Sequence, residues 1–211
     1  MTLKPHWTGR FALHLGLFLI PLAVLWLRPS SALALGSAPA LPAFNDFVSV
    51  VKNGQWNVLR GVYIENVLAL PIVQQPAGQS MYVSSNVGEI TQFNSASQAG
   101  NIGLLAHNNL AGAFFQQLAV GQEVRLIYGD GSVRNFVVTQ IQKYQALEPE
   151  NPFSSFRNLD QAETLNAAQL FNRAYSGNQH VTFQTCINAE GNASWGRLFV
   201  IAQPEQWPMT H

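Results

Sequence analysis

Three residues whose types together could carry out acyl transfer lie in strand-like, apolar stretches of this chain. His107 follows the run Ile-Gly-Leu-Leu-Ala, Cys186 follows Val-Thr-Phe-Gln-Thr, and Arg197 opens the run Leu-Phe-Val-Ile-Ala. A thiol can serve as a nucleophile, an imidazole as an acid or base, and a guanidinium as the cation that stabilises an oxyanion. We therefore take these three as the candidate catalytic residues.

Cys186 is the only cysteine, so it cannot form an internal disulfide. Because successive side chains of a strand point to opposite faces, Val181 and Phe183 face one way and Gln184 and Cys186 the other. A cysteine that only filled the core would share the face of Val181 and Phe183. Its predicted place at a strand end, before a polar loop at 188–194, also favours a reactive thiol. A buried, inert thiol is the alternative.

The other two candidates also have simpler interpretations. His107 ends its apolar run and precedes a turn at Asn108, as a solvated strand-end histidine would. His180, six residues before Cys186 and on the same strand face, is the second candidate for the acid or base. Arg197 stands at the mouth of a strand that looks buried on both faces, so it needs a ligand, a salt bridge or a path to solvent.

The first 34 residues have the pattern of an export signal. Lys4 and Arg10 precede an apolar stretch at 11–27, and Ser-Ala-Leu-Ala at 31–34 offers a small-residue cleavage site. This stretch is at the short limit for spanning a bilayer, so a cleaved signal peptide is favoured over a retained signal anchor. Both alternatives predict an extracytoplasmic protein of the cell envelope, either secreted or anchored to the membrane through residues 11–27.

We predict three segments: a signal peptide or anchor at 1–34, a linker at 35–43 and one catalytic domain at 44–205. Charged residues make up only 10% of the chain, and 11 Lys and Arg balance 11 Asp and Glu. A chain without a basic stripe is not suited to bind phosphate backbones, so we expect no nucleic-acid partner.

Short strand-like stretches dominate from residue 61 onward. The turn Gly129-Asp130-Gly131 between β-branched runs predicts a hairpin. Helices are predicted at 44–52 (with a hairpin at Asn53-Gly54 as the alternative), within 110–118, and at 165–175, capped near Gly177. Many short strands with few helices favour a closed β-barrel. The predicted strands are 62–64, 67–73, 80–84, 102–106, 123–128, 133–144, 180–188 and 197–202.

These motifs resemble those of the sortase family in type and in order. The order is His107-Asn108, then Thr182-Phe183-Gln184-Thr185-Cys186, then Arg197 at the start of an apolar strand. The likeness covers about residues 61–202. It also includes the opening strands, Gly61–Glu65 and Leu70–Val73, and the segment after the histidine, Leu118–Val124.

The resemblance implies a mainly β fold, a closed eight-stranded sortase-type β-barrel with a few short helices. It implies a cysteine transpeptidase that cleaves exported proteins at a C-terminal sorting signal of the Leu-Pro-x-Thr-Gly type. The acyl group would pass from Cys186 to an amine of the cell wall or of a pilin-like protein. His107 would protonate the leaving amine and Arg197 would hold the oxyanion, while Thr185 and Asn108 would bind the substrate. No cofactor and no metal is expected.

The chain departs from the family pattern in three respects. It has no match to the acidic calcium ligands that some family members carry, which is why no metal is expected. Ala106 precedes the histidine, where glycine is more usual. The interval from His107 to Cys186, 79 positions, is longer than is typical, with the excess at 146–179, beside the expected substrate groove. Two alternatives therefore stay open. One is a hydrolase that only trims its substrate, and the other is a sortase-fold protein that binds envelope peptides or is structural, with weak catalysis.

Overall fold

The computed structural model describes residues 41–205. The chain divides into two units, Met1–Ser37 and Ala38–His211, and the described residues all belong to the second. The predictions for the export signal at 1–34, and for the linker as far as residue 40, lie outside the described residues. None of the helices in residues 41–205 combines the length and the hydropathy that a membrane span requires.

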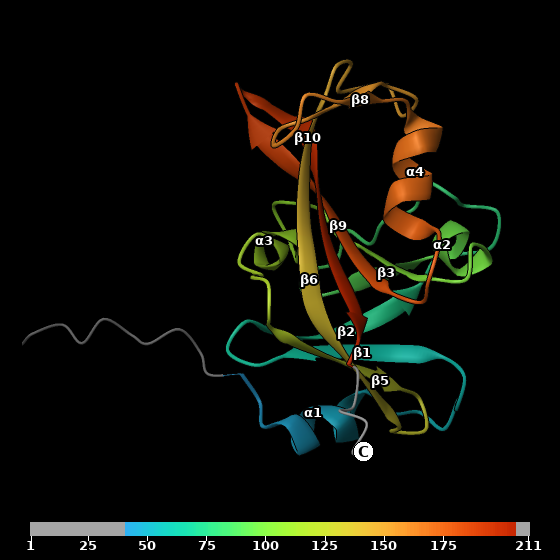
Figure 1. Ribbon diagram of the computed structural model, residues 1–211. Coiled ribbons are helices and arrows are strands. Elements are labelled where there is room, and N and C mark those ends of the chain that lie inside the picture. Colours follow the sequence, from blue (N-terminus) through green and yellow to red (C-terminus); the bar gives the residue numbers. More distant parts are fainter. Residues whose placement is uncertain (1–40, 206–211) are drawn as a thin grey trace, which may run out of the picture. The chain divides into compact units, whose positions relative to one another are not determined.

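The described residues are mainly β, with ten strands and four short helices (Figure 1). The helices are α1 (Phe44–Val51), α2 (Asn94–Gln98), α3 (Gly112–Phe115) and α4 (Ala167–Tyr175). The strands are β1 (Leu59–Ile64), β2 (Leu68–Gln74), β3 (Ile90–Phe93), β4 (Ile102–Leu105), β5 (Glu123–Tyr128), β6 (Val133–Ala146), β7 (Phe156–Asn158), β8 (Thr164–Leu165), β9 (Val181–Ala189) and β10 (Asn192–Pro204).

Eight of these strands close into a barrel. The order is β10-β9-β4-β3-β2-β1-β5-β6, and β6 pairs in turn with β10, so the ring has no free edge. The remaining two strands lie outside the ring: β7 pairs with the long β6, and β8 pairs with β7. The predicted fold, a closed eight-stranded barrel with a few short helices, is confirmed.

The barrel interior is filled by alternate side chains of its strands, as the period of two requires. On β9 these are Val181 and Phe183, and on β10 they are Leu198 and Val200. Phe115 of α3 adds its ring to this core, edge-on to Phe183 with 5.1 Å between ring centroids. The helical turns predicted within 110–118 are thus confirmed.

A second apolar cluster covers part of the outer surface of the barrel. It joins α2 and α4 to the outward side chains of β6 and β10, Tyr144 and Phe199. Figure 1 shows α4 and α2 on the same side of the barrel. The side chain of Asn166 caps the first turn of α4 in a reciprocal pair with Gln169. The stretch 198–202 of β10 is buried on both faces, as predicted, and this cluster covers part of its outer face.

One of the two predicted hairpins is present in the structure. The hairpin at Gly129–Gly131 is confirmed: it joins β5 to β6, and Gly131 has a φ of 90°. The alternative hairpin at Asn53-Gly54 is wrong, because helix α1 ends at Val51 and the amides of both residues donate to the Gly129 carbonyl.

The predicted polar loop at 188–194 is also wrong. Strand β9 continues to Ala189, and β10 begins at Asn192. Glu190 and Gly191 alone make the turn, with φ values of 52° and 76°, the positive pair that a tight type I′ hairpin requires. Cys186 therefore lies inside β9 rather than at its end.

The strand predicted at 80–84 is wrong as well. The side-chain amide of Gln75 donates to the carbonyls of Ser80 at 3.0 Å and of Tyr82 at 2.9 Å. These carbonyls are thus satisfied by a side chain rather than by a neighbouring strand. The strand of this region is β3, which follows at Ile90–Phe93 and pairs in parallel with β2.

Candidate functional site

The three candidate catalytic residues lie on neighbouring strands or at the end of one. Strand β9 is central, with β4 parallel to it on one side and β10 antiparallel on the other. Arg197 of β10 is the direct register partner of Cys186. Residues opposed in this way project from the same face of a sheet, with Cβ atoms about 4.5–5.5 Å apart. The aliphatic part of the Arg197 side chain and the Cys186 thiol are therefore neighbours.

Cys186 faces outward from the barrel, as the alternation predicts. Its neighbours in register on that face are Thr182 and Gln184, whereas Val181 and Phe183 fill the interior. The Thr182 hydroxyl donates to the Ala174 carbonyl of α4 at 2.6 Å, so this is the face that α4 covers. The thiol is half-buried beside that cover.

His107 comes two residues after the end of β4 and is exposed. The pairing of β4 with β9 continues through the Ala106 amide, which donates to the Gln184 carbonyl at 3.2 Å. The chain then turns, and the His107 carbonyl accepts from the amides of Leu110 and Gly112, both at 3.0 Å. The imidazole is thus carried on a hydrogen-bonded turn at the level of Cys186.

The turn that carries His107 is tied to its surroundings on two sides. The Asn108 side chain donates to the Ala193 carbonyl of β10 at 2.9 Å. The Thr185 hydroxyl, which is buried, donates to the Ala106 carbonyl at 2.9 Å. Asn108 and Thr185, both predicted to bind substrate, thus contact the backbone around the site. With its hydroxyl engaged, Thr185 would offer a substrate mainly its backbone.

Gly112 is required where the turn packs on β9. A Cβ atom at this position would lie 2.2 Å from the Thr185 hydroxyl oxygen and 2.6 Å from the His107 carbonyl oxygen. Any larger residue would push the His107 turn away from the strand that carries Cys186.

The Arg197 guanidinium is held by carbonyls and not by a carboxylate. Its Nη1 donates to the Ser194 carbonyl at 2.8 Å and to the Gly196 carbonyl at 2.9 Å. Its Cζ lies 5.9 Å from the centre of the Phe156 ring. Neither ion pair of residues 41–205 includes Arg197. These contacts fix one end of the guanidinium and leave Nε and Nη2 without a protein acceptor among the described residues.

One pocket of about 350 Å³ is lined by His107, Cys186 and Arg197 together. Most of the remaining lining is apolar and comes from three directions: Met81 between β2 and β3, Phe156 of β7, and the inner side of α4, including Leu170. The connection at 146–179 therefore forms part of the pocket wall, where the sequence predicted the border of a groove. A thiol beside a cation, an imidazole and an apolar cleft is an arrangement that could capture an extended acyl substrate.

His180 does not line this pocket. It is buried, and its ring nitrogens lie 2.7 Å from the Asn178 carbonyl oxygen and 2.9 Å from that of Ala174. Its contacts are with the backbone at the end of α4, so its role is to join that helix to β9.

The pocket is also lined by a hydrogen-bonded pair, Tyr175 and Gln184, that the sequence analysis did not propose as site residues. The Tyr175 hydroxyl, at the end of α4, donates to the Gln184 side-chain oxygen. Burial raises the pKa of the Tyr175 hydroxyl, so it stays a neutral donor. Gln184 could have been found from the alternation, since it shares the face of Cys186. Its hydrogen bond with Tyr175 depends on how α4 packs against the outer face of the barrel, which the sequence does not reveal.

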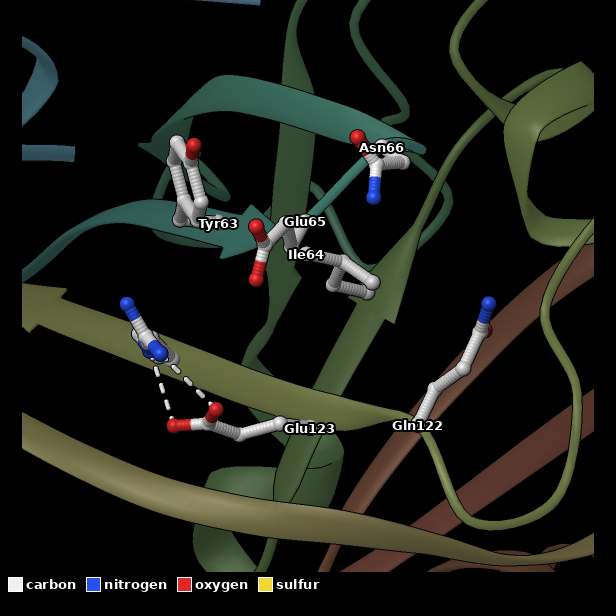
Figure 2. Close-up of a pocket in the computed structure, with 7 residues that line it drawn as sticks. Tyr63, Ile64, Glu65, Asn66, Gln122 and Glu123 are labelled. Carbon is white, nitrogen blue, oxygen red and sulfur yellow. Dashed lines mark hydrogen bonds and ion pairs between the residues drawn. The ribbon is translucent and has the colours of Figure 1, made fainter. Parts of the chain in front are cut away.

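A second pocket, of about 270 Å³, lies between the β1–β2 turn and the start of β5 (Figure 2). Glu65 and Asn66 come from the turn, and Glu123 comes from β5. The Glu123 carboxylate is bound by Arg125 through two hydrogen bonds of 2.8 Å, which lower the Glu123 pKa. This pocket contains none of the three candidate catalytic residues.

No group of three or more His, Cys, Asp or Glu side chains within the described residues could hold a metal ion. No family model matches this sequence, and no curated protein matches it.

Several solved structures do match, and they are sortases. Sortase A of Listeria monocytogenes is 13% identical, with a TM-score of 0.44, over 71% of this chain and 88% of that one. Sortase C from Clostridium perfringens SM101 is 15% identical, with a TM-score of 0.44, over 77% and 83%. Sortase C1 of Streptococcus agalactiae is 17% identical, with a TM-score of 0.46, over 83% and 80%. This chain is thus similar in structure to sortases, the family that its motifs resemble.

Proposed function

We propose that this protein is a cysteine transpeptidase of the cell envelope that acts on sorting-signal peptides of the Leu-Pro-x-Thr-Gly type. One observation carries the proposal: His107, Cys186 and Arg197 line one pocket, with Arg197 the register partner of Cys186. The family resemblance supplies the substrate class. The envelope location, with anchorage through residues 11–27 or release after cleavage, belongs to the same proposal.

In the first half-reaction, the Cys186 thiolate attacks the scissile carbonyl carbon. The carbonyl oxygen becomes an oxyanion, which the free donors of Arg197 stabilise. His107, as imidazolium, gives its proton to the leaving amine as the C–N bond breaks. The product is a thioester on Cys186, a released amine and a neutral imidazole.

In the second half-reaction, an incoming amine gives its proton to His107 as it attacks the thioester. The new amide is released, and the thiolate and imidazolium are restored. Water in place of the amine would give hydrolysis, so trimming and transfer differ only in the acceptor.

Intact-protein mass spectrometry tests this proposal. The purified full chain is incubated with Leu-Pro-x-Thr-Gly-like peptides, with and without an amine, beside the Cys186→Ala variant. We expect an adduct on Cys186 that the amine discharges, and none on the variant, whose melting temperature should be unchanged. Absence of an adduct with every peptide, together with a thiol that resists alkylation, would contradict the proposal and favour a binding or structural role.

A further inference from the structure

A polar pair interrupts the apolar wall of the catalytic pocket. The Tyr175 hydroxyl donates to the Gln184 side-chain oxygen, and both residues line the pocket. Tyr175 is 2% exposed. Its ring is held edge-on by Phe93 at 5.4 Å and by Phe199 at 6.3 Å between centroids. Tyr175 is therefore a rigid support for Gln184.

This support fixes the direction of the Gln184 amide. Because the oxygen accepts from Tyr175, the nitrogen is the end left for another partner. The Nε2 group makes no hydrogen bond to any residue of 41–205, and Gln184 is half-buried. Two N–H donors in a largely apolar cleft favour a ligand that brings an acceptor oxygen.

The distance from the thiol sets where that oxygen would lie. Gln184 is two residues before Cys186 and on the same face of β9, which corresponds to a separation of about 6.6–7 Å. An extended peptide has the same two-residue repeat. Consider a peptide that lies along β9 with its scissile carbonyl at Cys186. An acceptor group two residues from that carbonyl in the peptide then lies beside Gln184.

We propose that Gln184, held by Tyr175, is a specificity-determining residue that binds an acceptor oxygen of the peptide substrate, two residues from the scissile bond. The inference rests on the proposed function for its substrate class. The oxygen belongs either to the peptide backbone or to a carboxamide side chain, and these two sources predict different results.

Binding to the Cys186→Ala chain tests the proposal without turnover. Peptide pairs carry Ala or Asn two residues to either side of the scissile bond, and their Kd values are measured with and without Gln184→Met. Methionine keeps the length of the side chain but has no N–H donor. We expect a loss of affinity of about three- to tenfold, the effect of one neutral hydrogen bond. If the loss is confined to Asn peptides, a side chain is bound; if it is equal for all peptides, the backbone is bound.

Two further variants separate recognition from structure. Gln184→Glu keeps an oxygen for Tyr175 but loses the donors, so it should weaken binding at least as much as Gln184→Met. Tyr175→Phe frees the amide to rotate and should weaken binding less. If Gln184→Met leaves the Kd of every peptide unchanged, the proposal is overturned. Losses of affinity that only follow a fall in melting temperature would overturn it too. Peptide binding that depends on Gln184, without any adduct on the wild-type thiol, would refute the proposed reaction and leave this inference standing.

Discussion

The Arg197 side chain is oriented by carbonyl groups of its own strand. Its Nη1 is occupied by the carbonyls of Ser194 and Gly196, so the guanidinium is oriented before any ligand arrives. In the proposed mechanism, its remaining donors therefore face the developing oxyanion at little entropic cost. A lysine at this position would carry the charge but not the planar fork.

We predict that Arg197→Lys lowers kcat/KM by about 10²–10³-fold, the usual cost of removing an oxyanion donor. Folding should be preserved, because the stem and the charge remain. Peptide turnover and a thermal melt provide the measurements. Arg157→Lys, an exposed change on β7 outside the pocket lining, is the matched control and should turn over substrate like the wild type. Equal activity of the Arg197 variant would remove Arg197 from the mechanism.

At the scale of elements, α4 forms part of the pocket wall. Its stability should depend on the capping of its first turn. Asn166 caps that turn by accepting from the Gln169 amide at 2.9 Å. We expect Asn166→Ala to lower the free energy of unfolding by about 1 kcal/mol. Asn172→Ala, in the middle of the same helix and exposed, should cost nothing or slightly stabilise it. Urea unfolding of the two variants measures the difference, and equal losses would mean that the cap has no role.

The elements that could be predicted from sequence are those whose hydrogen bonds are local or whose apolar pattern is long. The alternation in β9 predicted the face of Cys186, and the apolar spacing at 165–175 predicted helix α4. Strands β3, β7 and β8 were missed because they have only two to four residues and depend on distant partners. The wrongly predicted strand at 80–84 has residues typical of strands, but the Gln75 side chain binds the carbonyls of Ser80 and Tyr82.

For the site, the types and order of the three catalytic candidates were enough to predict them as a set. Their geometry was not, because Arg197 lies opposite Cys186 only through a tight turn at Glu190-Gly191, where the sequence predicts a loop, together with a register shift between Asn192 and Gly196. The pairing of Tyr175 with Gln184 joins a helix to a strand, and no local pattern encodes such a contact.

Across the whole molecule, paired carboxylates should make stability fall in acid. Hydrogen bonds from Arg125 lower the Glu123 pKa below 4.5, and those from Arg173 do the same for Glu163. Because the folded-state pKa is the lower one, the stabilisation is present above pH 4.5 and is lost as pH falls through the folded-state values. We expect Glu123→Gln to reduce the difference in melting temperature between pH 7 and pH 3. Glu205→Gln, outside both ion pairs, is the control; an equal reduction there would contradict this assignment.

The closure of the barrel by β10 also has a consequence for the order of events during synthesis. β9 pairs with β4 across 79 positions of chain, and β10 joins β9 to β6. Contacts of such long range form slowly. Until residues near 200 have been made, Arg197 has no place opposite Cys186, and the nascent chain carries a thiol without its cation. In the proposed mechanism, the thiol therefore gains its cation only when the barrel is complete, so a chain without a closed barrel should not turn over peptide.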